Sequence, residues 1–115
     1  TLEPLVLLPD EDPIYLTIEG DAQGPAPELR AILDELRIRY GELRPAVEPM
    51  LRRADPRAGR DMFWPRSTLV SVELYRHPTQ GHPVLALTYA LDDAPEYSFI
   101  ARVENWKAVD VLVAG

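Results

Sequence analysis

The fold is decided by residues 70–89, VSVELYRHPTQGHPVLALTY, where two apolar runs flank a polar segment that holds both histidines of the chain. If His77 faces His82 across a four-residue loop, apolar residues meet on one side of the pleat. The resulting pairs are Leu74 with Leu85, Val72 with Leu87, and Val70 with Tyr89. Because a slip of one residue would turn all of them to the opposite face, this agreement favours the register. The sequence therefore predicts a β-hairpin with both histidines at its turn.

The same register test extends the hairpin to a four-stranded antiparallel meander. Strand-like alternation covers residues 68–76, 84–91, 97–104 and 109–113. The connection near residues 92–96 pairs Leu91 with Tyr97, Tyr89 with Phe99, Leu87 with Ala101, and Leu85 with Val103. The connection near Asn105, Trp106 and Lys107 pairs Val103 with Val109, Ala101 with Val111, and Phe99 with Val113. Since apolar residues meet in every pair, we expect these side chains to face one core.

The N-terminal half is expected to add one strand and a helical layer. Ile14, Leu16 and Ile18 alternate with more polar residues, which is the pattern of a half-buried strand. We expect residues 1–13 to form an arm or an edge strand, and residues 20–27 to form a loop.

Apolar residues recur at helical spacing across residues 27–54, but Gly41, Pro45 and Pro49 interrupt this segment. Proline lacks an amide hydrogen and crowds the carbonyl four residues earlier, so we expect two helical pieces or one kinked helix. The apolar stripe keeps its phase throughout, which places both halves on the same face of the sheet. Residues 55–66 are then expected to form a long loop.

These segments predict an α+β fold of two layers, in the order β-α-β-β-β-β. An antiparallel meander of four strands, together with the N-terminal strand, would be covered on one face by the kinked helix or helix pair. A length of 115 residues and a mass of 13.0 kDa suit one domain spanning residues 1–115.

The composition favours a soluble cytoplasmic protein. The chain is 46% hydrophobic and 27% charged, has no apolar run of bilayer length, and begins without the basic leader of a secretory signal. It contains no cysteine, which excludes disulfides and thiolate sites. The formal net charge of -7 and the pI near 4.7 oppose binding to nucleic acid phosphates, and they suit a basic protein partner, while the lack of a long apolar run predicts no membrane association.

The two histidines raise the question of a metal site. Cross-strand neighbours in a hairpin can offer two imidazoles to one ion. A zinc site needs a third or fourth ligand, however, and the chain has neither cysteine nor another histidine to supply one. We therefore interpret His77 and His82 as turn residues, and we expect no metal and no cofactor.

The sheet face opposite the helical layer is the main candidate binding surface. A polar set on this face comprises Tyr15, Glu73, Tyr75, Arg102 and Asp110. In the predicted register Arg102 lies directly across from Asp110, so the set is either a binding surface or a solvated face with a stabilising ion pair. Apolar residues expected on the same face are Leu69, Tyr75, Ile100 and Leu112, which suggests that another chain or the N-terminal arm covers it.

A second candidate surface is the loop patch of Arg57, Arg60, Phe63 and Trp64. Arginines interleaved with aromatic residues can bind nucleic acid through phosphates and stacking. The acidic body of the chain argues against nucleic acid, and arginines are also common where a helix ends.

No catalytic constellation is visible in the sequence. Ser67, Ser71 and Ser98 lack the glycine-flanked context of a nucleophile elbow, and there is no phosphate-binding glycine loop or zinc-protease motif. We therefore do not expect an enzyme.

The segments IYLTIEG at residues 14–20 and VDVLVAG at residues 109–115, with the helical region between them, resemble small uncharacterised bacterial domains of the DUF6985 and DUF2004 type. The resemblance covers residues 14–115 and implies a strand, a helix and a closing meander. Small acidic bacterial proteins of this size are also similar to immunity proteins that neutralise contact toxins.

The leading functional hypothesis is a non-enzymatic protein-interaction module, with immunity-like binding of a basic partner. One alternative is a small ligand-binding protein or enzyme that uses the open sheet face. The other is a homo-oligomeric structural protein that associates through this face or through an edge strand.

Overall fold

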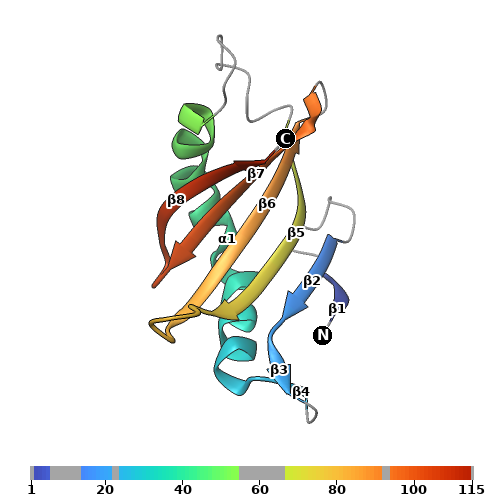
Figure 1. Cartoon of the computed structure of the whole chain (residues 1–115), viewed down its shortest axis with the longest axis vertical. Coiled ribbons are helices and arrows are strands. Elements are labelled where there is room, and N and C mark those ends of the chain that lie inside the picture. The colour runs from blue at the N-terminus through green and yellow to red at the C-terminus, as the bar shows by residue number, and fades with distance from the viewer. Residues whose placement is uncertain (1, 6–13, 22–23, 55–66, 92–93, 115) are drawn as a thin grey trace.

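A computed structural model of the chain describes residues 2–5, 14–21, 24–54, 67–91 and 94–114. One helix packs against one face of a six-stranded sheet (Figure 1), which confirms the predicted α+β fold. The strands run β1 (Leu2–Leu5), β2 (Ile14–Ile18), β5 (Ser67–Arg76), β6 (Pro83–Leu91), β7 (Ala94–Glu104) and β8 (Lys107–Ala114), which is also their spatial order.

The C-terminal meander forms as expected, with β5, β6, β7 and β8 paired antiparallel in sequence order. Leu74 pairs with Leu85 and Val72 pairs with Leu87, as the register test predicts. The other confirmed pairs are Leu85 with Val103, Leu87 with Ala101, Tyr89 with Phe99, Ala101 with Val111, and Phe99 with Val113. The apolar alternation therefore set the central registers correctly.

Three predicted pairs are wrong, each beside an irregularity in the ladder. Tyr89 pairs with Leu69 rather than Val70, Leu91 with Ala94 rather than Tyr97, and Val103 with Ala108 rather than Val109. A bulge adds one residue to one strand, so the side chains beyond it change faces. Leu69 consequently lies in the core at 5% exposure instead of on the open face, while Val70 is 40% exposed.

The N-terminal strands complete the sheet on its other side. β1 pairs antiparallel with β2, so the edge-strand alternative for this segment is confirmed for Leu2–Leu5. β2 pairs parallel with β5, which places Leu16 beside Val72. A parallel pair needs a long crossover connection, and the helix supplies it. Within residues 20–27, expected as a loop, β3 (Gly20–Asp21) and β4 (Gly24–Pro25) form a short ribbon.

The helical layer is one helix, α1 (Pro27–Ala54), with Pro45 and Pro49 inside it. The alternative of two separate helical pieces is therefore wrong. Both prolines are exposed, whereas an apolar stripe on the opposite side remains buried along the whole length. The stripe consists of Leu29, Leu33, Leu36, Tyr40, Leu43, Val47 and Leu51. Packing of this stripe on the sheet stabilises the helix across the missing hydrogen bonds.

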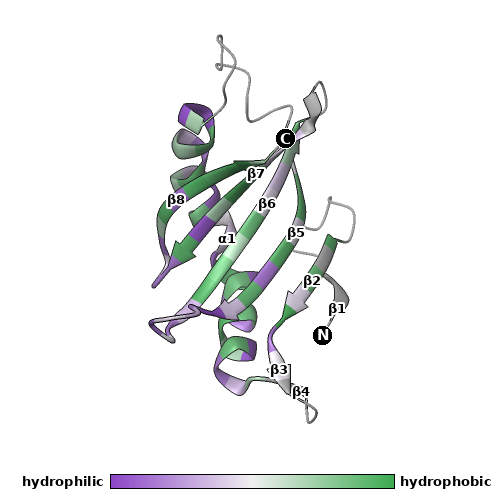
Figure 2. Cartoon of the chain, viewed as in Figure 1, coloured by the Kyte–Doolittle hydropathy of each residue, from purple (hydrophilic) through white to green (hydrophobic). Residues whose placement is uncertain are grey.

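The core lies between α1 and the sheet. A buried polar contact joins the two layers, where the hydroxyls of Tyr40 and Tyr89 lie 2.8 Å apart. Figure 2 shows β6 as an almost continuously hydrophobic strand in the middle of the meander, whereas hydrophilic segments interrupt β5 and β7. In the described ranges, no helix is long and apolar enough to cross a membrane.

Candidate functional site

The sheet face opposite α1 is uncovered by any helix that the structure describes, and it carries the polar set expected from the sequence (Figure 1). Glu73 and Tyr75 lie on β5, Arg102 on β7 and Asp110 on β8. Tyr15 lies in β2 at the register position beside Ser71. The set is thus distributed over four strands, and it stays a predicted binding surface.

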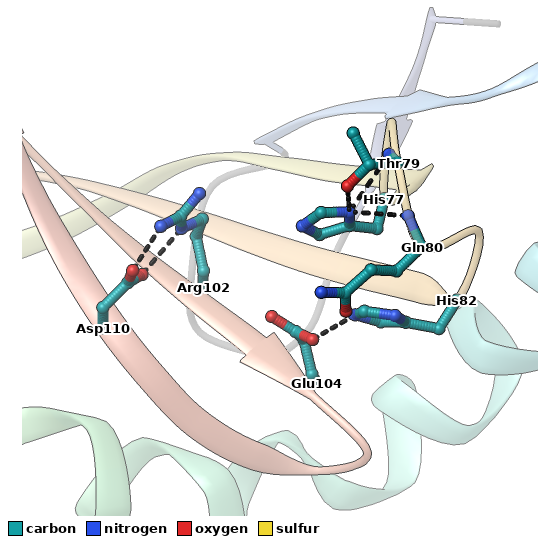
Figure 3. A network of polar contacts seen from close by, with 7 residues as sticks. All are labelled: His77, Thr79, Gln80, His82, Arg102, Glu104 and Asp110. Carbon is teal, nitrogen blue, oxygen red and sulfur yellow. Dashed lines mark hydrogen bonds and ion pairs between the residues drawn. The ribbon is translucent and has the colours of Figure 1, made fainter.

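Arg102 and Asp110 form the expected cross-strand ion pair. Their backbone positions are register partners, and Arg102 Nε donates to Asp110 Oδ1 at 2.6 Å while Nη2 contacts Oδ2 (Figure 3). This two-point hydrogen bond from Arg102 holds the pKa of Asp110 below its ordinary value. The same bond with Asp110 is the largest cause that raises the pKa of Arg102, and Tyr75 adds to it. The pair is therefore ionised at neutral pH.

The centre of the uncovered face is closed by its own side chains. Val84 and Ala86 of β6 are only 2% and 5% exposed, although no helix among the described residues lies over them. Tyr75 is the register partner of Val84, and Ala86 lies between Glu73 on β5 and Arg102 on β7. Because Val84 and Ala86 are short, the longer Tyr75 and Arg102 side chains can extend over them. This part of the face is a packed, polar-topped surface.

The edge strand β8 differs, because it exposes apolar side chains on both faces of the sheet: Leu112 pairs with Ile100, whereas its neighbour Val113 pairs with the buried Phe99. Val109, Leu112 and Val113 are 51%, 45% and 41% exposed. Leu112 was expected on the open face, but Val109 and Val113 were expected to face the core. The irregularity between Arg102 and Val103 removes Val109 from the core register, and Val113 lies near the end of an edge strand that has no outer neighbour in the described chain.

The histidine segment is a hairpin turn. The His77 amide donates to the His82 carbonyl at 2.8 Å, and the Gly81 amide donates to the His77 carbonyl at 2.9 Å. His77 Nδ1 lies 3.3 Å from the Thr79 amide and 3.1 Å from the Gln80 amide, so it accepts from the turn backbone (Figure 3). Gly81 has a φ of 79°, which glycine adopts without strain. The turn interpretation is confirmed, and its amides are satisfied locally.

One contact of this turn was missed from the sequence: His82 Nε2 contacts Glu104 Oε1 across the sheet. The two side chains are about one-third exposed. Because Leu85 pairs with Val103, the next residues along the two strands, Val84 and Glu104, lie across from each other. His82 is two residues before Val84 and lies on the same face. Extending the predicted register to Glu104 would therefore have predicted this contact. Among the residues with assigned structure, no three His, Asp or Glu side chains gather in a metal-binding arrangement.

The predicted loop patch of Arg57, Arg60, Phe63 and Trp64 falls within residues 55–66, which lie outside the described residues. It stays a prediction.

Comparison of the chain with family models, with curated proteins and with solved structures finds no match. The resemblance to domains of the DUF6985 and DUF2004 type therefore also stays a prediction, and the functional argument depends on the geometry of this chain alone.

Proposed function

We propose that this chain is a non-enzymatic protein-interaction module that binds its partner along β8 and the adjoining uncovered face. The observation that carries the proposal is the gathering of Val109, Leu112 and Val113, all at least 41% exposed, on one edge strand. Exposed apolar side chains that cluster on one element are typical of interaction sites, whereas single ones are not.

The backbone of β8 supports the same proposal. An edge strand offers unpaired N–H and C=O groups to an added strand, and proteins commonly prevent such pairing with short edges or proline. The opposite edge, β1, has only 4 residues and contains Pro4. β8 has 8 residues and no proline. Strand addition at β8 would give affinity through the backbone and specificity through alternate side chains.

The charge of the chain supports a basic partner, as an immunity-like function requires. A net charge of -7 would accelerate encounter with a positively charged protein. Much of the acidic excess lies in Asp10, Glu11 and Asp12 and in Asp92 and Asp93, outside the described residues. The net charge would therefore steer the encounter with the partner, and the apolar residues of β8 would make the contact itself.

Self-association is the second candidate, because β8 can pair antiparallel with its own copy. With Val111 on the two-fold axis, Asp110 lies opposite Leu112 and Val109 lies opposite Val113 in the second chain. No like charges then face each other, and most facing residues are apolar. This would make the chain a homo-oligomer.

Catalysis is not part of the proposal. His77 and His82 contact each other's ring, the turn amides, Thr79 and Glu104, and neither contacts a serine hydroxyl in the part of the chain that the structure describes. Within the polar set of the uncovered face, Arg102 and Asp110 are paired with each other.

The test compares Leu112→Lys with Val70→Lys. Both wild-type residues are exposed apolar strand residues, at 45% and 40%, but only Leu112 lies on the β8 edge. Each protein is used as bait in lysate of its source and is also measured by size-exclusion chromatography with light scattering. We expect a stoichiometric partner, or a dimer, with the wild type and Val70→Lys and neither with Leu112→Lys. A wild-type monomer that recovers no stoichiometric partner would overturn the proposal.

A further inference from the structure

We propose that a cleft between α1 and the end of the sheet is a binding site for a small planar aromatic molecule that carries a cationic hydrogen-bond donor, such as an aryl amidine. The site lies at the end of the sheet beside α1, at the turn between β7 and β8, and its lining includes no residue of β8. Its cavity volume is about 430 Å³. Ligand pockets range from about 300 to 1,000 Å³, so this one suits a molecule of one or two rings.

The lining of the cleft is mainly apolar. Leu85 of β6 and Val103 of β7 form part of the wall and are themselves only 3% and 2% exposed. Pro83 and Ile32 contribute further apolar surface from β6 and α1, and both are partly buried. A ring placed here would exchange water for apolar contacts on several sides.

Trp106 completes the lining from the turn between β7 and β8. Glu104 pairs with Lys107, so Asn105 and Trp106 are the two central residues of the turn, with φ angles of 52° and 64°. Such a turn requires positive φ at both positions and favours asparagine followed by glycine. Asn105 fits this preference. A bulky side chain at the second position strains the backbone.

The strained position of Trp106 therefore indicates a use for the indole beyond forming the turn. The guanidinium carbon of Arg39 lies 5.1 Å from the centroid of the Trp106 ring. The Trp106 side chain also packs against the core. These contacts hold the indole at the cleft. A planar aromatic ligand is the chemistry that an indole wall recognises best, because offset rings attract one another beyond simple burial of area.

Glu104 and His82 lie at the rim of the cleft, where the end of the sheet passes from the helix side to the uncovered face. Figure 3 shows the two side chains pointing toward each other, with His82 on the Oε1 atom of Glu104. The second carboxylate oxygen of Glu104 has no partner within the described ranges. A carboxylate at the rim accepts hydrogen bonds and favours a cation, so it selects an amidinium or ammonium group over a carboxylate.

The probe is benzamidine, followed by assigned amide and indole resonances of the full chain. We expect benzamidine to shift the indole signal of Trp106 and the amides of Leu85 and Val103, with a dissociation constant on the order of 1 mM for a ligand of this size. Benzoate, with the same ring and the opposite charge, should bind at least about tenfold more weakly, because it lacks the charge-assisted hydrogen bond.

Three variants make the test specific. Trp106→Gly should keep the fold, since glycine suits this φ, and should abolish the shifts at Leu85 and Val103. Ile32→Trp fills the cleft from the helix side and should abolish them as well, which gives a second readout if Trp106→Gly does not fold. Glu104→Gln should reduce the preference for benzamidine over benzoate to about a few-fold.

Leu112→Lys is the control, because it removes the apolar edge of the proposed partner surface and leaves the cleft intact. It should bind benzamidine as the wild type does, so failure of the cleft and failure of the partner surface are distinguishable. Absence of shifts at the cleft in the wild type at about 10 mM benzamidine, ten times the expected constant, would overturn the proposal. Unchanged shifts in both Trp106→Gly and Ile32→Trp would also overturn it.

Discussion

The two faces of the sheet reach burial by different means. On the face under α1, burial comes from apolar side chains that meet a second layer, as Leu87 and Tyr89 do. On the other face, Val84 and Ala86 are almost as buried, although no helix in the described ranges lies over them, and Tyr75 and Arg102 flank them. Stability therefore resides mainly in the covered face, while the uncovered face offers polar groups and a strand edge for recognition.

The largest loss of stability is expected on β6, where neighbouring residues that point to opposite faces should differ in their contribution to the free energy of unfolding. Leu87→Ala removes a fully buried side chain between Val72 and Ala101 and should lower the free energy of unfolding by about 2–5 kcal/mol. Thr88→Ala, one residue along on the uncovered face, should cost far less. Urea unfolding of both variants measures the difference. Equal losses would mean that the two faces contribute equally to stability.

The next effect concerns the polar contact between the layers. Tyr89→Phe removes one hydroxyl of the Tyr40–Tyr89 pair and leaves the other buried with one partner fewer, which should cost about 1–3 kcal/mol. Tyr75→Phe on the uncovered face is the matched change, and there water can replace the lost contact. Thermal unfolding of the two variants should show a smaller change for Tyr75→Phe, and the reverse order would contradict the comparison.

A smaller effect is expected from the ion pair of Arg102 and Asp110. Both side chains are more than one-third exposed, so Asp110→Asn should cost no more than about 1 kcal/mol at neutral pH. Because Arg102 lowers the pKa of Asp110 in the folded state, the pair stabilises the protein above the ordinary carboxyl value of 3.8. This stabilisation is lost as pH falls through the lowered pKa.

The stability difference between wild type and Asp110→Asn should therefore be constant from pH 7 to about pH 5 and shrink below about pH 4. Denaturant titrations at several pH values would show it. A difference that grows on acidification would refute the assigned sign.

The smallest effect on stability is expected at the edge of the uncovered face. Leu112→Lys should change the free energy of unfolding by less than about 0.5 kcal/mol, because Leu112 is already 45% exposed. Its effect on association is expected to be the larger one. If urea unfolding instead shows a loss similar to that of Leu87→Ala, Leu112 supports the folded chain itself and is a poor probe of the partner surface.

The sequence predicted strand register correctly where the strands are regular and wrongly beside irregularities. Alternation in the middle of β6 and β7 correctly paired Leu87 with Ala101 and placed Arg102 across from Asp110. It failed at Val70 and Val109, because an added residue in one strand leaves no mark in an alternating pattern of apolar residues. For the candidate sites, the predicted register was enough to find the ion pair of Arg102 with Asp110. Finding the contact of His82 with Glu104 required extending the pairing of β6 and β7 by one more residue.

Local sequence is enough to set the character of each segment. The two-residue period of the strands, the helical stripe from Leu29 to Leu51, and the turn at the histidines all depend on neighbours within a few residues. Three features arise only when the chain packs: β2 lies parallel to β5, Val84 and Ala86 are buried on the uncovered face, and Trp106 and Ile32 line one cleft. These features join residues far apart in the chain, and the free energy that selects them comes from packing whole layers together, which no local pattern records.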